Sequence, residues 1–425
     1  MTSPRRQPVR RVVVTGMGVI TPIGNDVPSF WAQLVGGVSG IRTITGFDPS
    51  RVTSKIAGEA QGFDASGVLD RKEMRRNDRY TQLALVATRE ALNQAGLPER
   101  LEGELADRTG TIIGSGVGGS ATLVEQITIN ATRGPDRISP FFVPMAIANL
   151  AAGQTAISFG ARGPSYATVS ACATGGHAIG EAAETIMRDD ADVMIAGGSE
   201  APVVEALVGG FAAMRALSTR NDDPAGASRP FDEGRDGFVI AEGAGVLVLE
   251  ELGHARRRGA QILAELVGYG ATADASHITL PAPGGSGAVR AARRALAKAG
   301  LEPSELDHIS AHATSTPEGD SAELAAFRTI LGDHAPKVSI TATKGAIGHT
   351  LGAAGGIGTV AAIQAMREGR VPPTLNLVDP APAMGDLDCT PLVARPREIH
   401  AALVNAFGFG GQNAALVVRR WEDDE

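Results

Sequence analysis

One cysteine, two histidines and one lysine stand in separate motifs that are rich in small residues. Cys172 lies within VSACATGGH (169–177), where small neighbours let a substrate approach the sulfur closely. His312 follows in AHATSTP, and Lys344 and His349 share TKGAIGH. A thiol nucleophile needs basic or charged partners, which the fold brings from distant parts of the chain. These four residues therefore indicate nucleophilic thiol catalysis.

The composition is typical of a globular protein. The chain has 425 residues, of which 43% are hydrophobic and 20% charged, enough for a large core or two fused units. No apolar run reaches the roughly 18 residues of a membrane span. Residues 1–11 are rich in Arg and Pro, with no apolar signal core behind them. We therefore expect neither a membrane protein nor a secreted one.

Cysteine usage and net charge narrow the location and the partners. Cys172 and Cys389 are the two cysteines, too few for a disulfide framework in so long a chain, which favours the reducing cytoplasm. The net charge of −8 argues against a general nucleic-acid binder. A local basic patch could still serve an acidic partner.

Strands and helices alternate along the sequence, which predicts an α/β fold with largely parallel sheets. Gly16 and the pair Gly197-Gly198 are interpreted as turns that end their strands. We expect strands at 11–16, 111–114, 192–198, 244–249, 262–269, 308–311, 338–341 and 402–405, and helices at 79–95, 175–187, 287–300 and 353–366.

The candidate residues follow predicted strands or begin predicted helices. Open α/β sheets bind ligands at the carboxyl ends of their strands, so a common site is expected. If Cys172 opens the helix at 175–187, the helix dipole favours its thiolate, since a free thiol has a pKa of about 8.5. The sequence contains no sharp linker, and we expect two parts, 1–260 and 261–425, packed as one body.

Several motifs, in the order of a known family, make the chain resemble a β-ketoacyl-acyl carrier protein synthase, most closely the synthase II type. The resemblance covers nearly the whole chain and implies a thiolase-like fold. That fold has two similar α/β halves in a five-layer αβαβα arrangement, and its members are usually homodimers. The motifs are VTGMG (14–18), GSGVGG (114–119), SPFFVP (139–144), RALSTRND (215–222), SRPFD (228–232), RDGF (235–238) and NAFGFGGQN (405–413).

The resemblance implies a decarboxylating condensation for fatty acid elongation. Cys172 takes the acyl group from an acyl carrier protein, and His312 and His349 donate hydrogen bonds to the carbonyl of the malonyl thioester. Lys344 sets the electrostatics and the position of the histidine pair. No cofactor or metal is expected, because the substrates themselves carry 4′-phosphopantetheine.

Further residues receive roles from the same resemblance. The backbone N–H groups of Cys172 and Phe409 form an oxyanion hole, and Gly408 and Gly410 let the Phe409 loop act as a gate. The pantetheine arm binds Thr314 and Thr316, and Val117 lies at the base of the acyl pocket. A basic cluster would dock the acidic carrier protein: Arg71, Lys72, Arg75 and Arg76, extended by Arg137, Arg215 and Arg220.

Two positions depart from the family pattern. Ala313 stands where a glycine usually follows the first catalytic histidine, which is tolerable unless the backbone needs φ > 0. Gly358, fourteen residues after Lys344, stands where a glutamate commonly pairs with the lysine. Polyketide ketosynthases also tend to have glycine there, so a role in polyketide or specialised-lipid synthesis stays open.

Other classes of protein were weighed. The GSGVGG motif formally fits a dinucleotide fingerprint and an NAD(P)-dependent oxidoreductase. Asp136 is the only carboxylate near the required distance, but it lies in a Gly-Pro loop rather than at a strand end. A thiolase would use a second cysteine as base, but Cys389 lacks the glycine-rich context. A non-catalytic partner of the chain-length-factor kind would lack the nucleophile Cys172.

Overall fold

Ten strands pair side by side, and their order contains the same topology twice. In the computed structural model, which describes residues 10–422, the order is β10-β9-β13-β14-β8-β1-β7-β6-β4-β5. The first copy consists of β1 (Val12–Ile20), β4 (Thr109–Gly114), β5 (Ser165–Tyr166), β6 (Val193–Glu200) and β7 (Gly243–Glu251). The second consists of β8 (Ala264–Ala273), β9 (His308–Ser310), β10 (Ser339–Thr341), β13 (Ala401–Gly408) and β14 (Gln412–Arg419).

The pairing directions repeat as well. In each copy the first strand is antiparallel to the last, and the last is antiparallel to the fourth. The fourth is parallel to the second, and the second to the third. A short antiparallel pairing of β1 with β8 joins the copies. The expectation of largely parallel sheets was therefore wrong, because each copy is a mixed sheet.

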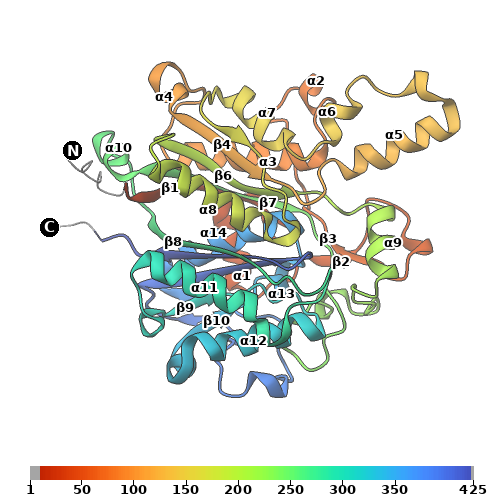
Figure 1. Cartoon of the computed structure of the whole chain (residues 1–425). Coiled ribbons are helices and arrows are strands. Elements are labelled where there is room, and N and C mark those ends of the chain that lie inside the picture. The colour runs from red at the N-terminus through yellow and green to blue at the C-terminus, as the bar shows by residue number, and fades with distance from the viewer. Residues whose placement is uncertain (1–9, 423–425) are drawn as a thin grey trace.

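Helices form three layers around these two sheets (Figure 1). The outer layer of the first copy contains α3 (Arg79–Gln94) and α7 (Leu150–Phe159), and that of the second contains α11 (Ser286–Ala299) and α12 (Pro317–Leu331). Between the sheets lie α8 (Thr174–Met187) and α14 (Ala354–Glu368), which contact strands of both copies. The five-layer αβαβα architecture is confirmed. The predicted boundary after residue 260 falls between α10 and β8.

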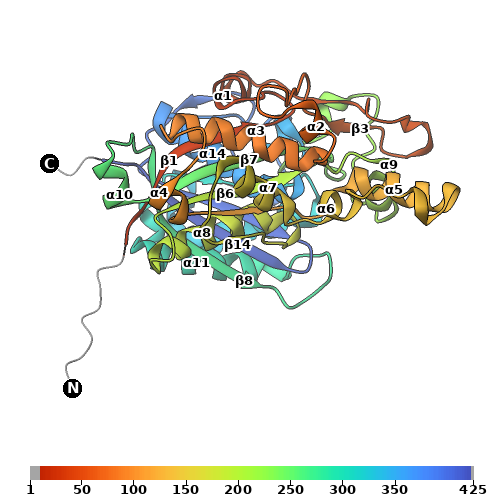
Figure 2. The same ribbon diagram turned by 90° about the horizontal axis from the view of Figure 1, so that it is seen from above.

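The remaining elements decorate this frame. Figures 1 and 2 both show α5 and α9 at the edge of the molecule opposite to α10. Among residues 10–422, no helix is both long and apolar enough to cross a membrane. The elements outside the five layers are α1 (Val27–Val35), β2 (Ile41–Thr43), β3 (Ile56–Gly58), α2 (Arg71–Met74), α4 (Gly103–Asp107), α5 (Ser120–Arg133), α6 (Phe142–Ala146), α9 (Glu205–Ala213), α10 (Leu252–Arg257), α13 (Lys344–Ile347), β11 (Arg370–Val371) and β12 (Arg395–Pro396).

Glycine lets two strands continue where turns were expected. β1 continues through Gly16. This residue is glycine because α3 lies directly over it, and a Cβ on Gly16 would lie 2.0 Å from Ala91 O. β6 runs through Gly197 and Gly198 to Glu200. A Cβ on Gly198 would lie 2.1 Å from Gly352 O. These glycines serve close packing rather than strand termination.

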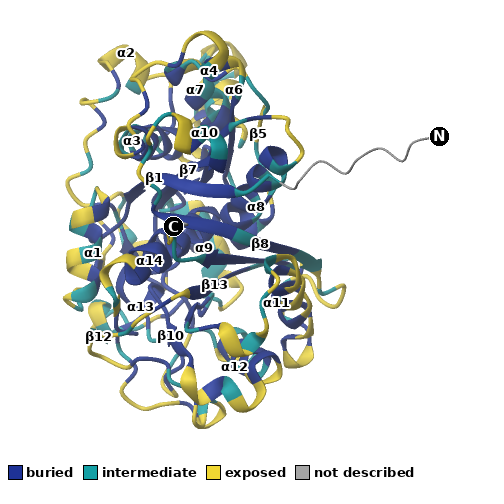
Figure 3. Cartoon of the chain, turned by 90° about the vertical axis from the view of Figure 1, so that its left-hand side faces the viewer, coloured by how far each residue is buried: buried dark blue, intermediate teal, exposed yellow. Residues whose placement is uncertain are grey.

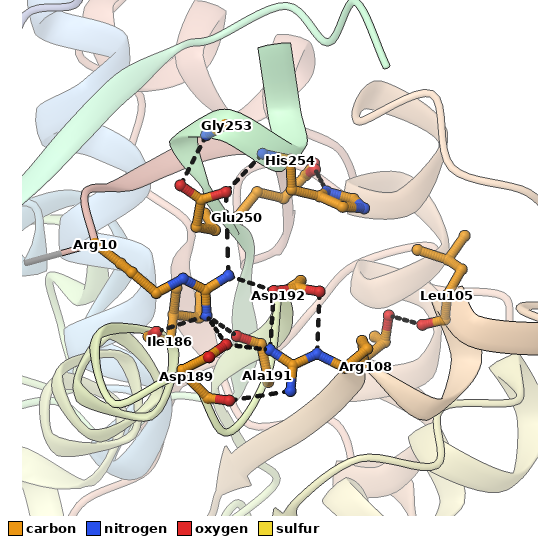
Figure 4. A network of polar contacts seen from close by, with 12 residues as sticks. Arg10, Leu105, Arg108, Ile186, Asp189, Ala191, Asp192, Glu250, Gly253 and His254 are labelled. Atoms are coloured by element: carbon orange, nitrogen blue, oxygen red, sulfur yellow. Dashed lines mark hydrogen bonds and ion pairs between the residues drawn. The ribbon is translucent and has the colours of Figure 1, made fainter. Parts of the chain in front are cut away.

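An ion network joins Arg10, just before β1, to the loop that follows α8 (Figure 4). Arg108 Nη2 lies 2.6 Å from Asp189 and 3.0 Å from Asp192. Arg10 pairs with the same two aspartates and also donates to the carbonyls of Ile186 and Ala191. The two guanidinium groups hold the pKa of Asp192 at about 2, although burial opposes this shift. The network fixes the loop between α8 and β6.

The two central helices approach each other backbone to backbone at glycines. Residues 354–366 of α14 are buried throughout, and Figure 3 shows α14, β1 and β8 largely in the buried class. At the crossing, a Cβ on Gly355 would lie 2.3 Å from Gly176 N. A Cβ on Gly175 of α8 would lie 2.9 Å from Gly356 N. The backbones approach this closely only because the crossing consists of glycine.

This crossing gives a first prediction. Gly355→Ala places a methyl group against backbone that cannot move aside, and should lower the free energy of unfolding by about 3 kcal/mol, the upper range for overpacking. Thermal unfolding at fixed protein concentration measures the change. Gly210→Ala on α9, whose Cβ would meet nothing within 4 Å, is the control and should keep or slightly raise the melting temperature. Equal melting temperatures for both variants would contradict the proposed constraint.

Candidate active site

Cys172 sits on a tight turn at the amino end of α8. It lies in the short 3₁₀ turn η3 (Ala171–Ala173), and Ala171 adopts φ +49°. Ser170 N donates to Thr174 Oγ1 at 2.9 Å, which closes the turn onto the first residue of α8. Ser170 Oγ also lies 2.7 Å from His177 Nδ1. Local hydrogen bonds therefore hold the thiol at the end of the helix.

The loop between β13 and β14 covers this turn. A Cβ on Gly408 would lie 2.5 Å from Ser170 O and 3.1 Å from Cys172 N, so glycine is required for the contact. Gly410 adopts φ +85° and donates its N–H to Ile278 O at 2.7 Å. The backbone N–H groups of Phe409 and Cys172 both donate toward the thiol. Two N–H donors thus converge on the sulfur.

His312 and His349 lie against each other. Their ring centroids are 5.5 Å apart at an interplanar angle of 86°. The Phe238 ring packs edge-on against His349, and Phe407 packs against His312. Burial, together with the charge of Lys344, holds the pKa of both imidazoles well below its usual value. Both rings are therefore neutral at neutral pH and each can donate one N–H.

One cavity of about 390 Å³ brings most of the sequence-predicted residues together. Lys344 is not among its walls but is buried behind them, at 4% exposure. Thr314 Oγ1 and Thr316 Oγ1 lie 3.0 Å apart. The predicted residues that line the cavity are Cys172, His312, His349, Thr314, Thr316, Val117, Gly408, Phe409 and Arg215.

The other predicted docking residues lie away from the cavity lining. Lys72 is an exposed residue of α2, and Arg75 follows at its carboxyl end. Arg76 is exposed too, but its guanidinium stacks 4.7 Å from the centre of the Phe141 ring. Arg137 is exposed in a short 3₁₀ turn after α5. The cluster therefore spans α2 and the neighbouring α5–α6 segment.

Burial raises the pKa of the Cys172 thiol to about 12, while the positive charge of Lys344 and the two N–H donors act in the opposite direction. The expected thiolate is therefore not the resting form. Burial also lowers the pKa of Lys344 to about 8, opposed by Glu323. Lys344 is thus charged at neutral pH and stabilises negative charge as it develops on the sulfur.

Glu323 on α12 is a site residue that sequence reasoning missed. Its carboxylate accepts the N–H of His312 at 2.8 Å and that of Ala313 at 2.6 Å. Asn405 Nδ2 donates to it at 3.3 Å. Burial raises the pKa of Glu323 to about 7. A signal existed in the sequence, because Glu323 shares the inward helical face with apolar residues such as Phe327.

The two departures from the family pattern have structural consequences. Ala313 adopts φ +23°, a conformation that favours glycine, so the Glu323 hydrogen bond holds a strained residue in place. A Cβ on Gly358 would lie 3.3 Å from Ser310 Oγ and 3.6 Å from Val404. The carboxylate that acts on Lys344 comes from Glu323 on α12, not from the position of Gly358.

The dinucleotide alternative is wrong. Its motif follows β4, but the N–H groups of Gly116 and Val117 donate to the Glu200 carboxylate. They cannot also cradle a pyrophosphate, which would need the same donors. Cys389 lies buried in a separate apolar cluster and does not line the cavity, so it cannot serve as the base of a thiolase. Among residues 10–422, no group of three or more His, Cys, Asp or Glu side chains could hold a metal ion.

The site brings a thiol, two neutral imidazoles and the backbone N–H groups of Cys172 and Phe409 to one cavity, as expected of a condensing enzyme. Residues 9–255 match the family model of the β-ketoacyl synthase N-terminal domain, and residues 263–378 match that of the C-terminal domain. The chain belongs to the β-ketoacyl synthase family, as the sequence motifs predicted.

Close relatives carry a more specific name. The 3-oxoacyl-[acyl-carrier-protein] synthase 2 of Synechocystis is 49% identical over 97% of this chain and 99% of its own length. The synthase of the same name from Staphylococcus aureus is 48% identical over 97% and 99%. The predicted resemblance to the synthase II type is confirmed.

Solved structures have the same fold. A β-ketoacyl synthase from Burkholderia phymatum matches with a TM-score of 0.90 and 35% identity, over 97% of this chain and 100% of that one. A type II polyketide ketosynthase, solved with its acyl-carrier protein and a bound hexaketide, matches with a TM-score of 0.89 and 35% identity, over 98% and 100%.

The position of Lys344 generates a second prediction. Lys344→Met removes the charge that lowers the pKa of Cys172, so alkylation by iodoacetamide at neutral pH should slow, by about tenfold for each unit of pKa gained. Peptide mass spectrometry over time measures the rate at Cys172. Lys298→Met, which removes a half-exposed lysine of α11, is the control. If both variants react at the wild-type rate, Lys344 does not act on the thiol.

Proposed function

We propose that the protein elongates fatty acids by condensing an acyl group on Cys172 with malonyl-acyl carrier protein. The observation that carries this proposal is the convergence of the thiol, both imidazoles and two N–H donors on one cavity. No cofactor is required, because each reacting group arrives as a thioester of the carrier's pantetheine arm.

In the first half-reaction, Cys172 Sγ attacks the thioester carbonyl of the acyl carrier protein. The N–H groups of Cys172 and Phe409 stabilise the oxyanion, and the charge of Lys344 stabilises the sulfur as it loses its proton. The pantetheine thiol leaves with a proton, and the acyl group stays on Sγ. Val117 lines the part of the cavity assigned to the acyl chain.

In the second half-reaction, the malonyl thioester binds beside the histidines. Its carboxylate leaves as CO₂, and N–H donors from His312 and His349 stabilise the enolate oxygen. Each such donor contributes about 2.7–4 kcal/mol. The enolate carbon attacks the acyl carbonyl, the C–S bond to Cys172 breaks, and the departing sulfur takes up a proton from solvent, which restores the thiol. Neutral imidazoles suit this step, because the oxygen accepts hydrogen bonds without taking a proton outright.

Polyketide synthesis is the second candidate. The hexaketide-bound ketosynthase has the same fold, and Gly358 matches the residue typical of polyketide enzymes. The identity of 48–49% to 3-oxoacyl-[acyl-carrier-protein] synthases 2, against 35% to that polyketide ketosynthase, favours fatty acid elongation.

The scarcity of cysteine supports a location in the cytoplasm, and an apolar face supports a homodimer. β5 ends the sheet, with one edge unpaired in a single chain. Large exposed apolar side chains lie on α5–α7 and around β5, and an interface would remove them from water. They are Ile127, Val143, Ile147, Ile157, Tyr166 and Val169. A two-fold partner at this edge would extend the sheet and cover them.

The third prediction separates the two half-reactions. Cys172→Ala should abolish the mass gained from acyl-carrier protein, while it leaves malonyl decarboxylation in place. His349→Ala should load the acyl group but slow decarboxylation by about 10²–10³. Intact-protein mass spectrometry with a series of acyl lengths, together with CO₂ release, measures both steps. His400→Ala, at an exposed site, is the control. Acyl loading that survives Cys172→Ala would refute the proposal.

The fourth prediction concerns carrier docking. Replacing both Arg75 and Arg76 by Glu should raise the KM for acyl-carrier protein by about fivefold or more, since exposed pairs contribute about 0.2–1 kcal/mol each. The KM for an acyl-pantetheine without the protein should not change. The matched control replaces Arg293 and Arg294, exposed on α11, by Glu. An unchanged KM for the carrier-linked substrate removes the assignment.

A further inference from the structure

A second buried carboxylate, Glu200, lies beside the cavity and has no part in the steps above. It is the last residue of β6 and is fully buried. Its carboxylate accepts four hydrogen bonds. The donors are Ser115 Oγ at 2.5 Å, Gly116 N at 2.6 Å, Val117 N at 3.1 Å and Gly352 N at 2.9 Å.

The hydrogen bonds favour the anionic form of Glu200. Three of the four partners are backbone N–H groups, which cannot accept. Ser115 Oγ donates to Glu200 and accepts from Gly118 N at 2.9 Å. Burial raises the pKa of Glu200, and the hydrogen bonds oppose that shift. The fixed, neutral donors thus stabilise negative charge on the buried carboxylate.

Glycine makes the close approach of these donors to Glu200 possible. A Cβ on Gly116 would lie 2.8 Å from Glu200 Oε2, and a Cβ on Gly352 would lie 2.6 Å from the same atom. Both glycines therefore leave room for the oxygen between two N–H groups. Loss of one of these donors would leave a buried negative charge less well solvated, which costs free energy. The hydrogen bonds therefore resist movement of Gly116 and Gly352 away from Glu200.

The carboxylate joins two parts of the active site that belong to different copies of the fold. Gly116 and Val117 follow β4 in the first copy and line the cavity. Gly352 lies in the turn η8 (Leu351–Ala353), three residues after His349 in the second copy. One oxygen, Oε2, accepts from both sides.

We propose that Glu200 is a positioning residue, which fixes the cavity wall at Gly116–Val117 relative to the turn that carries His349. The wall that contacts the acyl chain and the turn that carries His349 are then held by the same carboxylate. A shift of one therefore moves the other. This inference rests on the proposed function, since it concerns the acyl chain and the condensation step.

Glu200→Gln tests the inference while it keeps the size of the side chain. Whichever way the amide points, its NH₂ group faces at least one backbone N–H donor. We expect condensation per active site to fall by about tenfold, the effect of one lost hydrogen bond to a charged group. The ratio of loading rates for palmitoyl- and butyryl-carrier protein should also shift, by threefold or more.

Each measurement is normalised to folded, titratable Cys172, so a partly unfolded variant does not imitate the effect. Glu250→Gln is the matched control, because Glu250 is also fully buried and lies on the neighbouring strand β7, bonded to Thr15 and Arg258. It should lose stability but keep the wild-type rate per site and the wild-type chain-length ratio.

A wild-type ratio and a wild-type rate per site in Glu200→Gln would overturn the inference. If that variant does not fold, Ser115→Ala decides, because it removes one donor and keeps the carboxylate. Its ratio of palmitoyl to butyryl loading rates should change by twofold or more, in either direction. An unchanged ratio overturns the inference. Failure of the wild-type protein to load any acyl group would instead refute the proposed function.

Discussion

The close crossing of α8 and α14 is the constraint on which the active site depends. Two helices of the middle layer meet through glycine, with Gly355 against Gly176, and their amino ends therefore reach the same cavity. One of these ends presents Cys172 and the other follows His349. Larger side chains at the crossing would separate the nucleophile from its partner. The packing of α8 against α14 thus sets how far Cys172 lies from His349.

Near the imidazoles, the buried charges of Lys344 and Glu323 act on each other. Lys344 is buried yet retains a pKa of about 8, and it suppresses the protonation of both imidazoles. Glu323 raises the pKa of Lys344 against the effect of burial and orders the backbone that carries His312. The arrangement keeps the imidazoles as neutral donors, and it confines positive charge to the residue that supports the sulfur.

The sequence revealed the α/β class, most strands of the two sheets, four of the layered helices and the key residues of the cavity, because these depend on local periodicity and on recognisable motifs. It could not reveal what depends on contacts between distant segments. Gly16 marked a turn by local rules, but the structure uses it to admit α3. Glu323 was invisible as a partner of Lys344, since 21 positions along the chain separate the two residues. Strand direction also escaped local rules, because it follows from how the helices return the chain.

The repeated strand order extends to the helices of the middle layer. α8 and α14 occupy the same place in the two copies, each between the third and fourth strands. Equivalent ends of these helices nevertheless carry different chemistry, because Cys172 comes directly before α8 and His349 comes shortly before α14. A fold whose two copies repeat each other thus holds one asymmetric site, with sulfur from one copy and nitrogen from the other.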